Sequence, residues 1–500
     1  MAESDKIYDI LIIGGGVNGA GIARDAAGRG LSVMLVEKGD LASATSSAST
    51  KLFHGGLRYL EHYAFSLVRK ALIEREVLLQ NMPHIARPMR FVLPHLKGMR
   101  PAWLLRLGLF FYDNLGGRKL LPGTRVLNLK TDLAGMALKP TFRRAFEYSD
   151  GWVDDARLVV LNAVDAADKG AVIRTQTSVT SAKRQEGLWQ VSLGAEVVKA
   201  RALVNAAGPY VPDVGCTIKG VADPDPIRLV RGSHIVVPRL FTHDRAYFFQ
   251  NPDGRIMFAI PYEEDFTLLG TTDVDHKGGL SDVRCSEEEI AYLCAAASEY
   301  FAETVKPETV VWTYAGVRPL DDAGDGKASA ASRDYHLNLE GEESPLVSVY
   351  GGKITTYRKL SEQVMDLLAP TFPKAGKHWT IAAPLPGGDF PYDGRADLAR
   401  SIQAAFPFLD TPQSRRFARL YGTEAFRMFA GTKDAAGLGA AFGSGLTALE
   451  LRWLIRREFA RTAEDVIWRR TKLGLRLSAQ EIETLESWME NHVTEILAGD

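Results

Sequence analysis

The most constraining feature of the sequence is a glycine-rich turn close to its beginning. Residues 7–13, IYDILII, form a short apolar run typical of a buried parallel strand, and the turn GGGVNG follows directly. Its glycines, spaced as GxGxxG, are Gly14, Gly16 and Gly19. A helix is expected over 17–29 and a second strand over 31–37, ending at Glu37. Such glycines allow a tight turn, close approach of backbone to a pyrophosphate and close helix packing, while the acid accepts from a ribose hydroxyl. The unit therefore predicts a dinucleotide-binding α/β domain of Rossmann-like type.

Composition and charge narrow the class of protein further. The chain has 500 residues, of which 46% are apolar and 24% charged, so two or three globular domains are expected. A net charge of −1 argues against a nucleic-acid partner. The three cysteines, Cys216, Cys285 and Cys294, form no metal-binding spacing and favour a reduced, cytoplasmic protein. No apolar run approaches the ~18 residues of a membrane-spanning helix, and the N-terminus does not have the form of a signal peptide.

The rest of the chain divides into segments with helical, β-rich or linker-like sequence patterns. A helix that begins near Leu57 is expected to end near Asn81, and short β-rich runs over 233–273 predict an antiparallel sheet that roofs the nucleotide site. Residues 383–394 are typical of a linker, and 395–500 are expected to form a separate helical domain. Its predicted capping boxes are Thr447–Glu450, Thr462–Asp465 and Ser478–Glu481. The nucleotide-binding domain, 1–382, is expected to comprise about 1–95, 150–225 and 335–382, interleaved with a β region of about 96–149 and 226–334.

Three further observations favour FAD over NAD. Residues 201–211, RALVNAAGPYV, form another apolar strand that ends in a turn of small residues, where backbone can pass close to a nucleotide. Residues 351–360, GGKITTYRKL, begin a predicted helix whose positive end could stabilise negative charge on a flavin. The third is the spread of these elements along the chain, near residues 14, 37, 45, 207 and 352, as contacts to an extended cofactor would be.

Four segments together resemble the FAD-dependent glycerol-3-phosphate dehydrogenases of the aerobic, respiratory type. They are IGGGVNGAGIARDAAGRG, TSSASTKLFHGGLRYLEHY, GVRPL and GGKITTYRKL. The resemblance implies a FAD domain of glutathione-reductase type, an antiparallel substrate-side sheet and a C-terminal helical domain. It also implies oxidation of sn-glycerol 3-phosphate to dihydroxyacetone phosphate, with electrons passing through FAD to a membrane quinone. A homodimer is expected as well.

The residues expected at the cofactor are small, lie in the glycine turns, or supply the ribose acid. They are Gly14, Gly16, Gly19, Glu37, Thr45, Ser46, Ser47, Ser49, His54, Gly55, Gly56, Ala207, Gly208, Gly352, Lys353 and Thr355. Small side chains at 45–49 leave room for the cofactor. Thr355 and Thr356 could orient the flavin or cap the helix that follows.

The remaining candidates follow from the chemistry of a phosphorylated alcohol. Phosphate binding is expected at Arg58, Tyr59, Arg318 and Arg333, because the guanidinium fork suits a phosphate. Arg318, between a glycine and a proline in GVRPL, is expected in a loop. The base that takes the hydroxyl proton is expected to be His234 or, as second choice, His54. Lys353 is expected to stabilise the anionic reduced flavin or the substrate oxygen.

Membrane association is expected through residues 96–121, where Trp, Leu and Phe alternate with Arg and Lys. The protein would then lie on the inner face of the cell membrane. The alternative is that this helix is buried against a neighbouring domain. Two other functions stay open: a soluble glycerol-3-phosphate oxidase that uses oxygen, and a flavin-binding protein without turnover.

Overall fold

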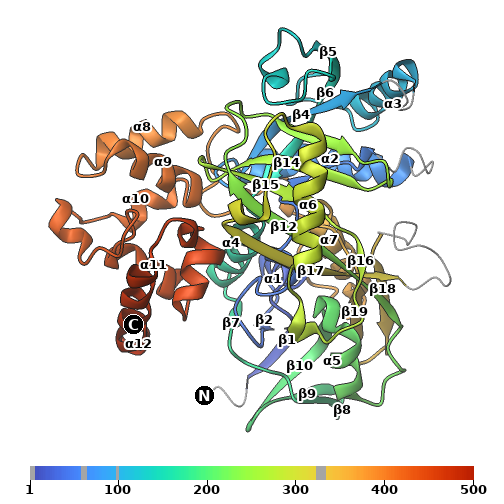
Figure 1. Cartoon of the computed structure of the whole chain (residues 1–500). Coiled ribbons are helices and arrows are strands. Elements are labelled where there is room, and N and C mark those ends of the chain that lie inside the picture. The colour runs from blue at the N-terminus through green and yellow to red at the C-terminus, as the bar shows by residue number, and fades with distance from the viewer. Residues whose placement is uncertain (1–5, 58–64, 97–100, 322–333, 500) are drawn as a thin grey trace.

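The computed structural model describes residues 6–57, 65–96, 101–321 and 334–499. Two sheets form its centre, one above the other in Figure 1. In the first sheet, β1 (Ile7–Ile13) lies between β2 (Val33–Val36) and β10 (Glu196–Asn205), and both neighbours run parallel to it. Its other strands are β7 (Val172–Arg174), β8 (Ser181–Gln185), β9 (Leu188–Leu193), β11 (Ile218–Lys219), β18 (His336–Glu340) and β19 (Leu346–Tyr350). The predicted α/β class and its first βαβ unit are confirmed.

Three helices share one apolar core with this sheet, together with the end of α2 (Phe65–Asn81). They are α1 (Val17–Gly28), α4 (Asp155–Asp168) and α7 (Tyr357–Leu368). The contact between α1 and α7 is close at Gly21, where an added Cβ would lie 2.7 Å from the ring of Tyr357. The packing therefore fixes the start of α1, and with it the glycine turn, against the segment that precedes α7.

The second sheet contains all four β-rich runs predicted over 233–273. They form β12 (Ile227–Pro238), β13 (Ala246–Gln250), β14 (Ile256–Tyr262) and β15 (Phe266–Gly270), with antiparallel β12–β15, β15–β14 and β14–β13 pairs. The other strands are β3 (Leu52–Phe53), β4 (Ala86–His95), β5 (Arg125–Asn128), β6 (Arg144–Val153), β16 (Val274–Asp275) and β17 (Trp312–Asp321). One pair, β13–β4, is parallel. The sheet thus draws on residues 86–95, which the sequence had assigned to the nucleotide domain, because β4 pairs along its whole length with β6.

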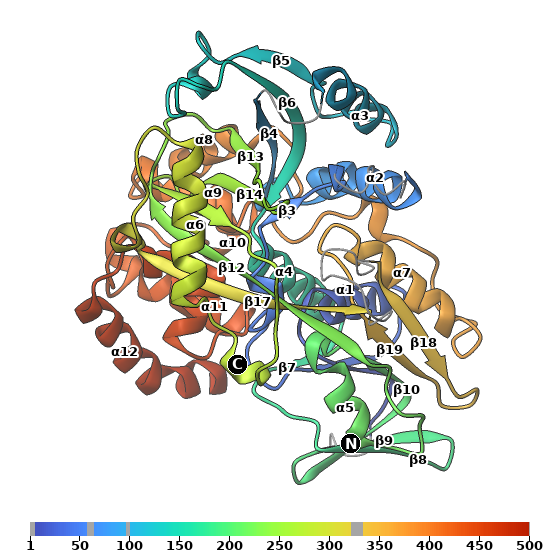
Figure 2. The same cartoon turned by 45° about the vertical axis from the view of Figure 1, so that its right-hand side comes forward.

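Several helices surround the second sheet. They are α2 (Phe65–Asn81), α3 (Ala102–Asn114) and α6 (Glu287–Tyr300), whereas α5 (Val211–Thr217) packs against β10, β11 and β19 of the first sheet. The predicted end of α2 at Asn81 is confirmed, whereas its predicted beginning falls partly on residues 58–64, outside the described residues. In both views α3 and β5 lie at the end of the molecule opposite β8 and β9 (Figures 1 and 2).

The chain after residue 394 is helical and has its own apolar core. It contains α8 (Arg395–Ala405), α9 (Thr411–Leu420), α10 (Glu424–Met428), α11 (Ala448–Arg457), a π-helical turn (Asp465–Arg470) and α12 (Ala479–Ala498). The capping boxes at Ser478–Glu481 and Thr462–Asp465 are present as reciprocal hydrogen bonds. The one predicted at Thr447–Glu450 is wrong, because the Glu450 carboxylate instead accepts from Arg416 and Tyr421.

Candidate active site

A cavity of about 750 Å³ lies where the carboxyl ends of β1, β2 and β10 meet the second sheet. Ligands in open α/β sheets bind at this edge of the strands. Most of the residues predicted at the cofactor line it: Gly14, Gly16, Glu37, Thr45, Ser46, Ser49, His54, Gly56, Ala207, Gly208, Gly352, Lys353 and Thr355. Arg318 lines it from the substrate side. The fold therefore brings together segments more than 300 residues apart.

Three predicted cofactor residues do not line the cavity but support its wall. A Cβ on Gly19 would lie 1.9 Å from the carbonyl oxygen of Gly14, which explains the close packing of α1 on the turn. Ser47 offers its carbonyl to the ammonium of Lys51. Gly55 donates its N–H to the hydroxyl of Tyr112.

The glycine turn and Glu37 form one hydrogen-bonded unit. Gly14 has a φ of +112°, in the region that favours glycine, and a Cβ there would lie 2.6 Å from the carbonyl oxygen of Ala206. The Glu37 carboxylate accepts from the N–H groups of Gly15 at 2.7 Å and Gly39 at 2.8 Å. This fixes the acid at the end of β2, where it lines the cavity.

The opposite wall is tied to the same turn through Asn18. Its Nδ2 donates to the Gly351 carbonyl at 3.0 Å, while its buried Oδ1 has no partner within the described part of the chain. Gly351 and Gly352 have φ of +75° and +104°, and a Cβ on Gly352 would lie 2.7 Å from Asn18 Nδ2. Buried polar atoms rarely stay unpaired, so Asn18 Oδ1 fits a donor from a bound ligand. The turns and this acceptor together fit a dinucleotide such as FAD.

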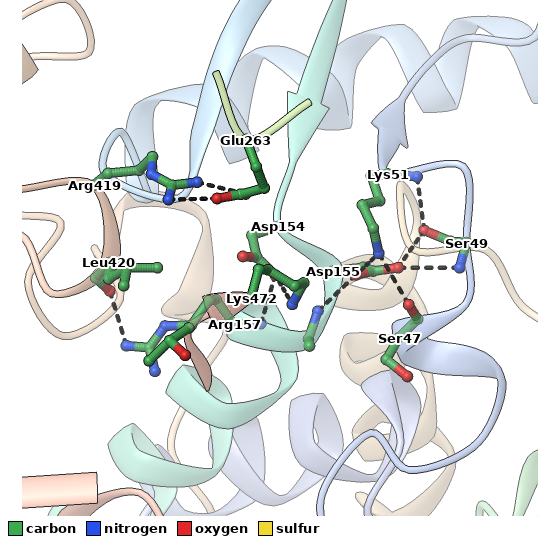
Figure 3. Close-up of polar contacts among 12 residues, drawn as sticks. Ser47, Ser49, Lys51, Asp154, Asp155, Arg157, Glu263, Arg419, Leu420 and Lys472 are labelled. Atoms are coloured by element: carbon green, nitrogen blue, oxygen red, sulfur yellow. Dashed lines mark hydrogen bonds and ion pairs between the residues drawn. The ribbon is translucent and has the colours of Figure 1, made fainter. Parts of the chain in front are cut away.

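The hydroxyl-rich segment 45–51 is held by hydrogen bonds to other parts of the chain. Thr45 donates to the Val317 carbonyl at 2.6 Å, and Ser46 Oγ accepts from the N–H of Val17. Ser49 donates both its N–H and its hydroxyl to Asp155 Oδ2, at 3.0 and 2.7 Å (Figure 3). These hydroxyl groups therefore order the loop, and its small side chains leave the space above it open.

Lys51 is a functional candidate that the sequence reasoning missed. Its side chain is fully buried, its φ is +61°, and its ammonium donates to Asp155 Oδ1 at 2.7 Å and to the Ser47 carbonyl at 2.9 Å. The neighbouring Asp154 pairs with Lys472 of the helical domain at 3.3 Å (Figure 3). The adjacent acids at 154–155, which open α4, were the available signal, since two buried carboxylates require cationic partners.

The prediction that Arg318 lies in a loop is wrong. It lies within β17, opposite Val230 of β12, and not in a loop, because β17 pairs with β12 along ten residues. It forms an ion pair with Asp273 and donates to Thr271 Oγ1 at 3.3 Å. Both Thr271 and Asp273 also line the cavity. A strand holds the guanidinium more rigidly than a loop would, and an anionic ligand would share it with Asp273.

His234 lies behind the cavity wall. Its ring is 1% exposed, stacks on Tyr314 with centroids 4.7 Å apart, and places Nε2 3.0 Å from the Thr50 hydroxyl, which does line the cavity. Burial, with smaller contributions from Arg318 and Lys51, holds the pKa of His234 well below its ordinary value. The imidazole is therefore neutral and reaches the cavity through Thr50, whereas His54 lines it directly.

The predicted phosphate contacts Arg58, Tyr59 and Arg333 lie outside the described residues. Thr356 precedes α7 as expected, but its side chain does not cap the helix. The Thr355 side chain is buried at the cavity wall.

The fold and this cavity define a dinucleotide-dependent oxidoreductase. The chain belongs to the FAD-dependent oxidoreductase family, whose model matches residues 9–358. Residues 379–495 match a second model, described as the C-terminal domain of alpha-glycerophosphate oxidase. The FAD prediction is thereby confirmed.

The chain is also similar to proteins of named activity. The chain is 50% identical to the D-erythritol 1-phosphate dehydrogenase of Brucella abortus, over 98% of this chain and 99% of that protein. It is 47% identical to the aerobic glycerol-3-phosphate dehydrogenase of Escherichia coli, with the same coverage. Among solved structures, the glycerol-3-phosphate dehydrogenase of Bacillus halodurans in complex with FAD has a TM-score of 0.72 and 27% identity, over 98% of this chain and 95% of that one.

Proposed function

We propose that the protein oxidises sn-glycerol 3-phosphate at C2 to dihydroxyacetone phosphate. The observation that carries this proposal is the presence of Arg318 and Lys353 in the same cavity as the dinucleotide turn. A phosphate dianion needs cationic donors, and the wall between these two residues can present a secondary alcohol to the cofactor. FAD, which the glycine turn and Glu37 would hold, would supply the acceptor for the hydride from C2. Arg58, Tyr59 and Arg333 stay as predicted further contacts to the phosphate.

In this proposal His54 takes the proton of the C2 hydroxyl. It lines the cavity, whereas His234 is separated from it by Thr50. A base works best with a pKa near the working pH, and burial lowers the pKa of His234 far below that. His234 and Thr50 then hold the wall in place. Lys353 stabilises the negative charge that develops on the substrate oxygen.

D-erythritol 1-phosphate is a second candidate substrate, because the relative that is 50% identical carries that name. It shares the phosphate and a secondary alcohol with glycerol 3-phosphate but has one carbon more. Steady-state kcat/KM for both esters decides between them. We expect glycerol 3-phosphate to be preferred, and Arg318→Met to lower kcat/KM for it by about 10–100-fold. Preference for the tetritol ester would contradict the proposed substrate, and an unchanged Arg318→Met variant would contradict the proposed phosphate contact.

We further propose that a membrane quinone takes the electrons and that α3 contacts the lipid surface. Among the helices that the structure describes, none has the length and apolar character of a transmembrane span. On α3, Trp103 is 68% and Phe110 61% exposed, with Arg106 exposed beside them. Aromatic side chains and cations in this arrangement suit the headgroup region of a bilayer. Arg100, a predicted cation of this surface, lies outside the described residues.

The oxidase alternative and the predicted homodimer are open to direct tests. Formation of one peroxide per substrate oxidised, at full rate and without quinone, would favour the oxidase. Light scattering of the purified holoenzyme gives the mass that the dimer prediction requires.

A further inference from the structure

Helix α3 has two fully buried side chains, Leu109 and Tyr112, although the large apolar residues on its other faces are exposed. Tyr112 is 2% exposed and points away from the surface that we propose for lipid contact. Its ring packs edge-on against Tyr148, which lines the cavity, with centroids 5.8 Å apart. Tyr112 thus connects the helix to the active-site wall.

The hydroxyl of Tyr112 joins two groups of the cavity wall. It lies 2.8 Å from the N–H of Gly55, and 2.8 and 2.9 Å from the two oxygens of Asp150. A peptide N–H can only donate, so the phenol oxygen accepts from Gly55 and its single proton goes to Asp150. The geometry therefore fixes the direction of both hydrogen bonds.

The pKa shifts of Tyr112 and Asp150 support the same direction for the hydrogen bond between them. Burial, reinforced by Asp150, raises the pKa of Tyr112 well above its ordinary value, so the phenol keeps its proton. Burial also raises the pKa of Asp150, but Arg75 Nη1 lies 2.6 Å from Oδ1 and favours the ionised carboxylate. Asp150 itself lines the cavity. The phenol proton thus has a fixed acceptor at the wall, which Arg75 holds in place.

Gly55 lies in close contact with two side chains, so a larger residue there would displace them. A Cβ there would lie 2.5 Å from Leu72 Cδ2 and 2.9 Å from the Tyr112 hydroxyl. Its N–H belongs to the peptide that links it to His54, and the N–H and C=O of a trans peptide point in opposite directions. The bond to Tyr112 therefore fixes the orientation of the His54 carbonyl and the place from which the imidazole enters the cavity.

We propose that Tyr112 is a positioning residue, whose phenol oxygen orients the His54–Gly55 peptide at the active-site wall and ties α3 to that wall. Without the phenol oxygen, the Gly55 N–H would lose its hydrogen-bond acceptor and the Asp150 carboxylate would lose a donor. The inference that kcat depends on this residue rests on the proposed oxidation, in which His54 takes the proton.

The test is Tyr112→Phe, which removes one oxygen atom and keeps the ring. In the FAD-loaded enzyme we expect kcat for glycerol 3-phosphate to fall about 10-fold while KM changes less than about 2-fold, because a misplaced base slows the reaction without removing the phosphate contacts. The visible circular dichroism of the bound oxidised flavin should also change, since His54 and Gly56 line its cavity. Both are measured well below the melting temperature of the variant.

Tyr262→Phe is the matched control. Tyr262, at the end of β14, is a buried tyrosine of the same apolar cluster as Tyr112, and its hydroxyl has no hydrogen-bond partner among the described residues. Its removal should leave kcat, KM and the flavin spectrum unchanged. A loss equal to that of Tyr112→Phe would show that any buried hydroxyl matters, and would overturn the assignment.

A merely structural role predicts a lower melting temperature with unchanged kcat and unchanged flavin circular dichroism, and that result would overturn the proposal.

Should Tyr112→Phe not retain FAD, the Asp150→Asn variant serves as the test in its place. For that variant we expect a several-fold loss of kcat at constant KM, and an unchanged kcat would overturn the proposal. If no polyol phosphate reduces the wild-type flavin, the proposed oxidation fails. The flavin circular dichroism of the variant, which needs no substrate, then still decides the role of Tyr112.

Discussion

At the scale of single residues, Lys51 combines a fully buried ammonium with a positive φ, directly below the loop that lines the cavity. Replacing Lys51 by Met would leave the Asp155 carboxylate buried without its cation. Breaking one side of such a pair costs about 3–5 kcal/mol, so we expect the free energy of unfolding to fall by that amount and FAD to be lost on gel filtration. Urea denaturation and the flavin-to-protein absorbance ratio measure both.

Arg400→Met is the control for Lys51→Met. Arg400 pairs with Asp397 on the surface of the helical domain, with both side chains more than 70% exposed. Exposed pairs contribute about 0–1 kcal/mol, so this variant should keep its stability and its FAD. Equal losses in the two variants would contradict the special position of Lys51.

His84 supplies a pH dependence of stability. Burial, with smaller contributions from Arg157 and Arg395, lowers its pKa from 6.5 to about 3. Between these two values the unfolded chain binds a proton that the folded chain does not, so stability falls as the pH drops through this window. From pH 7.5 to 5.5 this single group costs about 1.4 kcal/mol.

His84→Gln should therefore show a smaller loss of unfolding free energy between pH 7.5 and 5.5, by about 1.4 kcal/mol. Urea titrations at the two values measure the difference. His336→Gln, at a histidine with 58% of its side chain exposed, serves as the reference and should behave like the wild type. A wild-type slope in His84→Gln would place the titrating group elsewhere.

At the scale of elements, the π-helical turn Asp465–Arg470 connects the helical domain to the cofactor cavity. Arg470 and Arg469 both bind the carboxylate of Asp40, at 2.6 to 2.8 Å, and Asp40 precedes the cavity-lining residues 42–46. Trp468 stacks on Trp312 of β17, with centroids 4.4 Å apart. The helical domain therefore supports the loop beneath the cofactor.

Arg470→Met removes the guanidinium that donates to both carboxylate oxygens of Asp40 and leaves only Arg469 bound to it. We expect the Kd for FAD to rise at least about 10-fold, because loop 40–46 loses its buried anchor. Titration of the apoprotein with FAD, followed by quenching of flavin fluorescence, measures the change. Arg452→Met, at an exposed arginine of α11, is the matched control and should bind FAD normally; an unchanged Kd in Arg470→Met would contradict this role.

The elements that could be predicted are those with a strong local pattern. GxGxxG, the acid at Glu37 and the four β-rich runs identified their strands, although β12 begins at Ile227, six residues before its predicted run. Arg318 was placed in a loop because Gly316 and Pro319 flank it, yet its partner strand β12 overrides that local signal. The contact between Asp40 and Arg470 joins residues 430 positions apart, and no local pattern encodes such a pair.

At the scale of the whole molecule, the position of α3 favours contact with a surface outside the protein. It lies with β5 at the end of the molecule opposite β8 and β9 (Figure 2). Most of its large apolar side chains are exposed. The sequence left a buried helix open as the alternative, and the exposure of Trp103 and Phe110 argues against it.

Charge reversal at Arg100, Arg106 and Arg118 should release the protein from vesicles that contain anionic lipid, since each cation near such a surface contributes about 1 kcal/mol. Co-sedimentation with phosphatidylglycerol vesicles measures the bound fraction. Reversal of Arg143 and Arg144, at the start of β6, tests whether charge alone explains the effect. Sedimentation of the α3 variant at the wild-type level would show that another part of the chain binds the membrane.

The property that most directly tests the proposed activity is the reduction of the bound flavin by a phosphorylated polyol. Anaerobic stopped-flow absorbance follows this reduction directly, with glycerol 3-phosphate and glycerol compared at equal concentration. We expect rapid bleaching by the phosphate ester and none by glycerol, because glycerol lacks the phosphate that we propose Arg318 to bind. Equal bleaching by glycerol, or none by either polyol phosphate, would contradict the proposed oxidation.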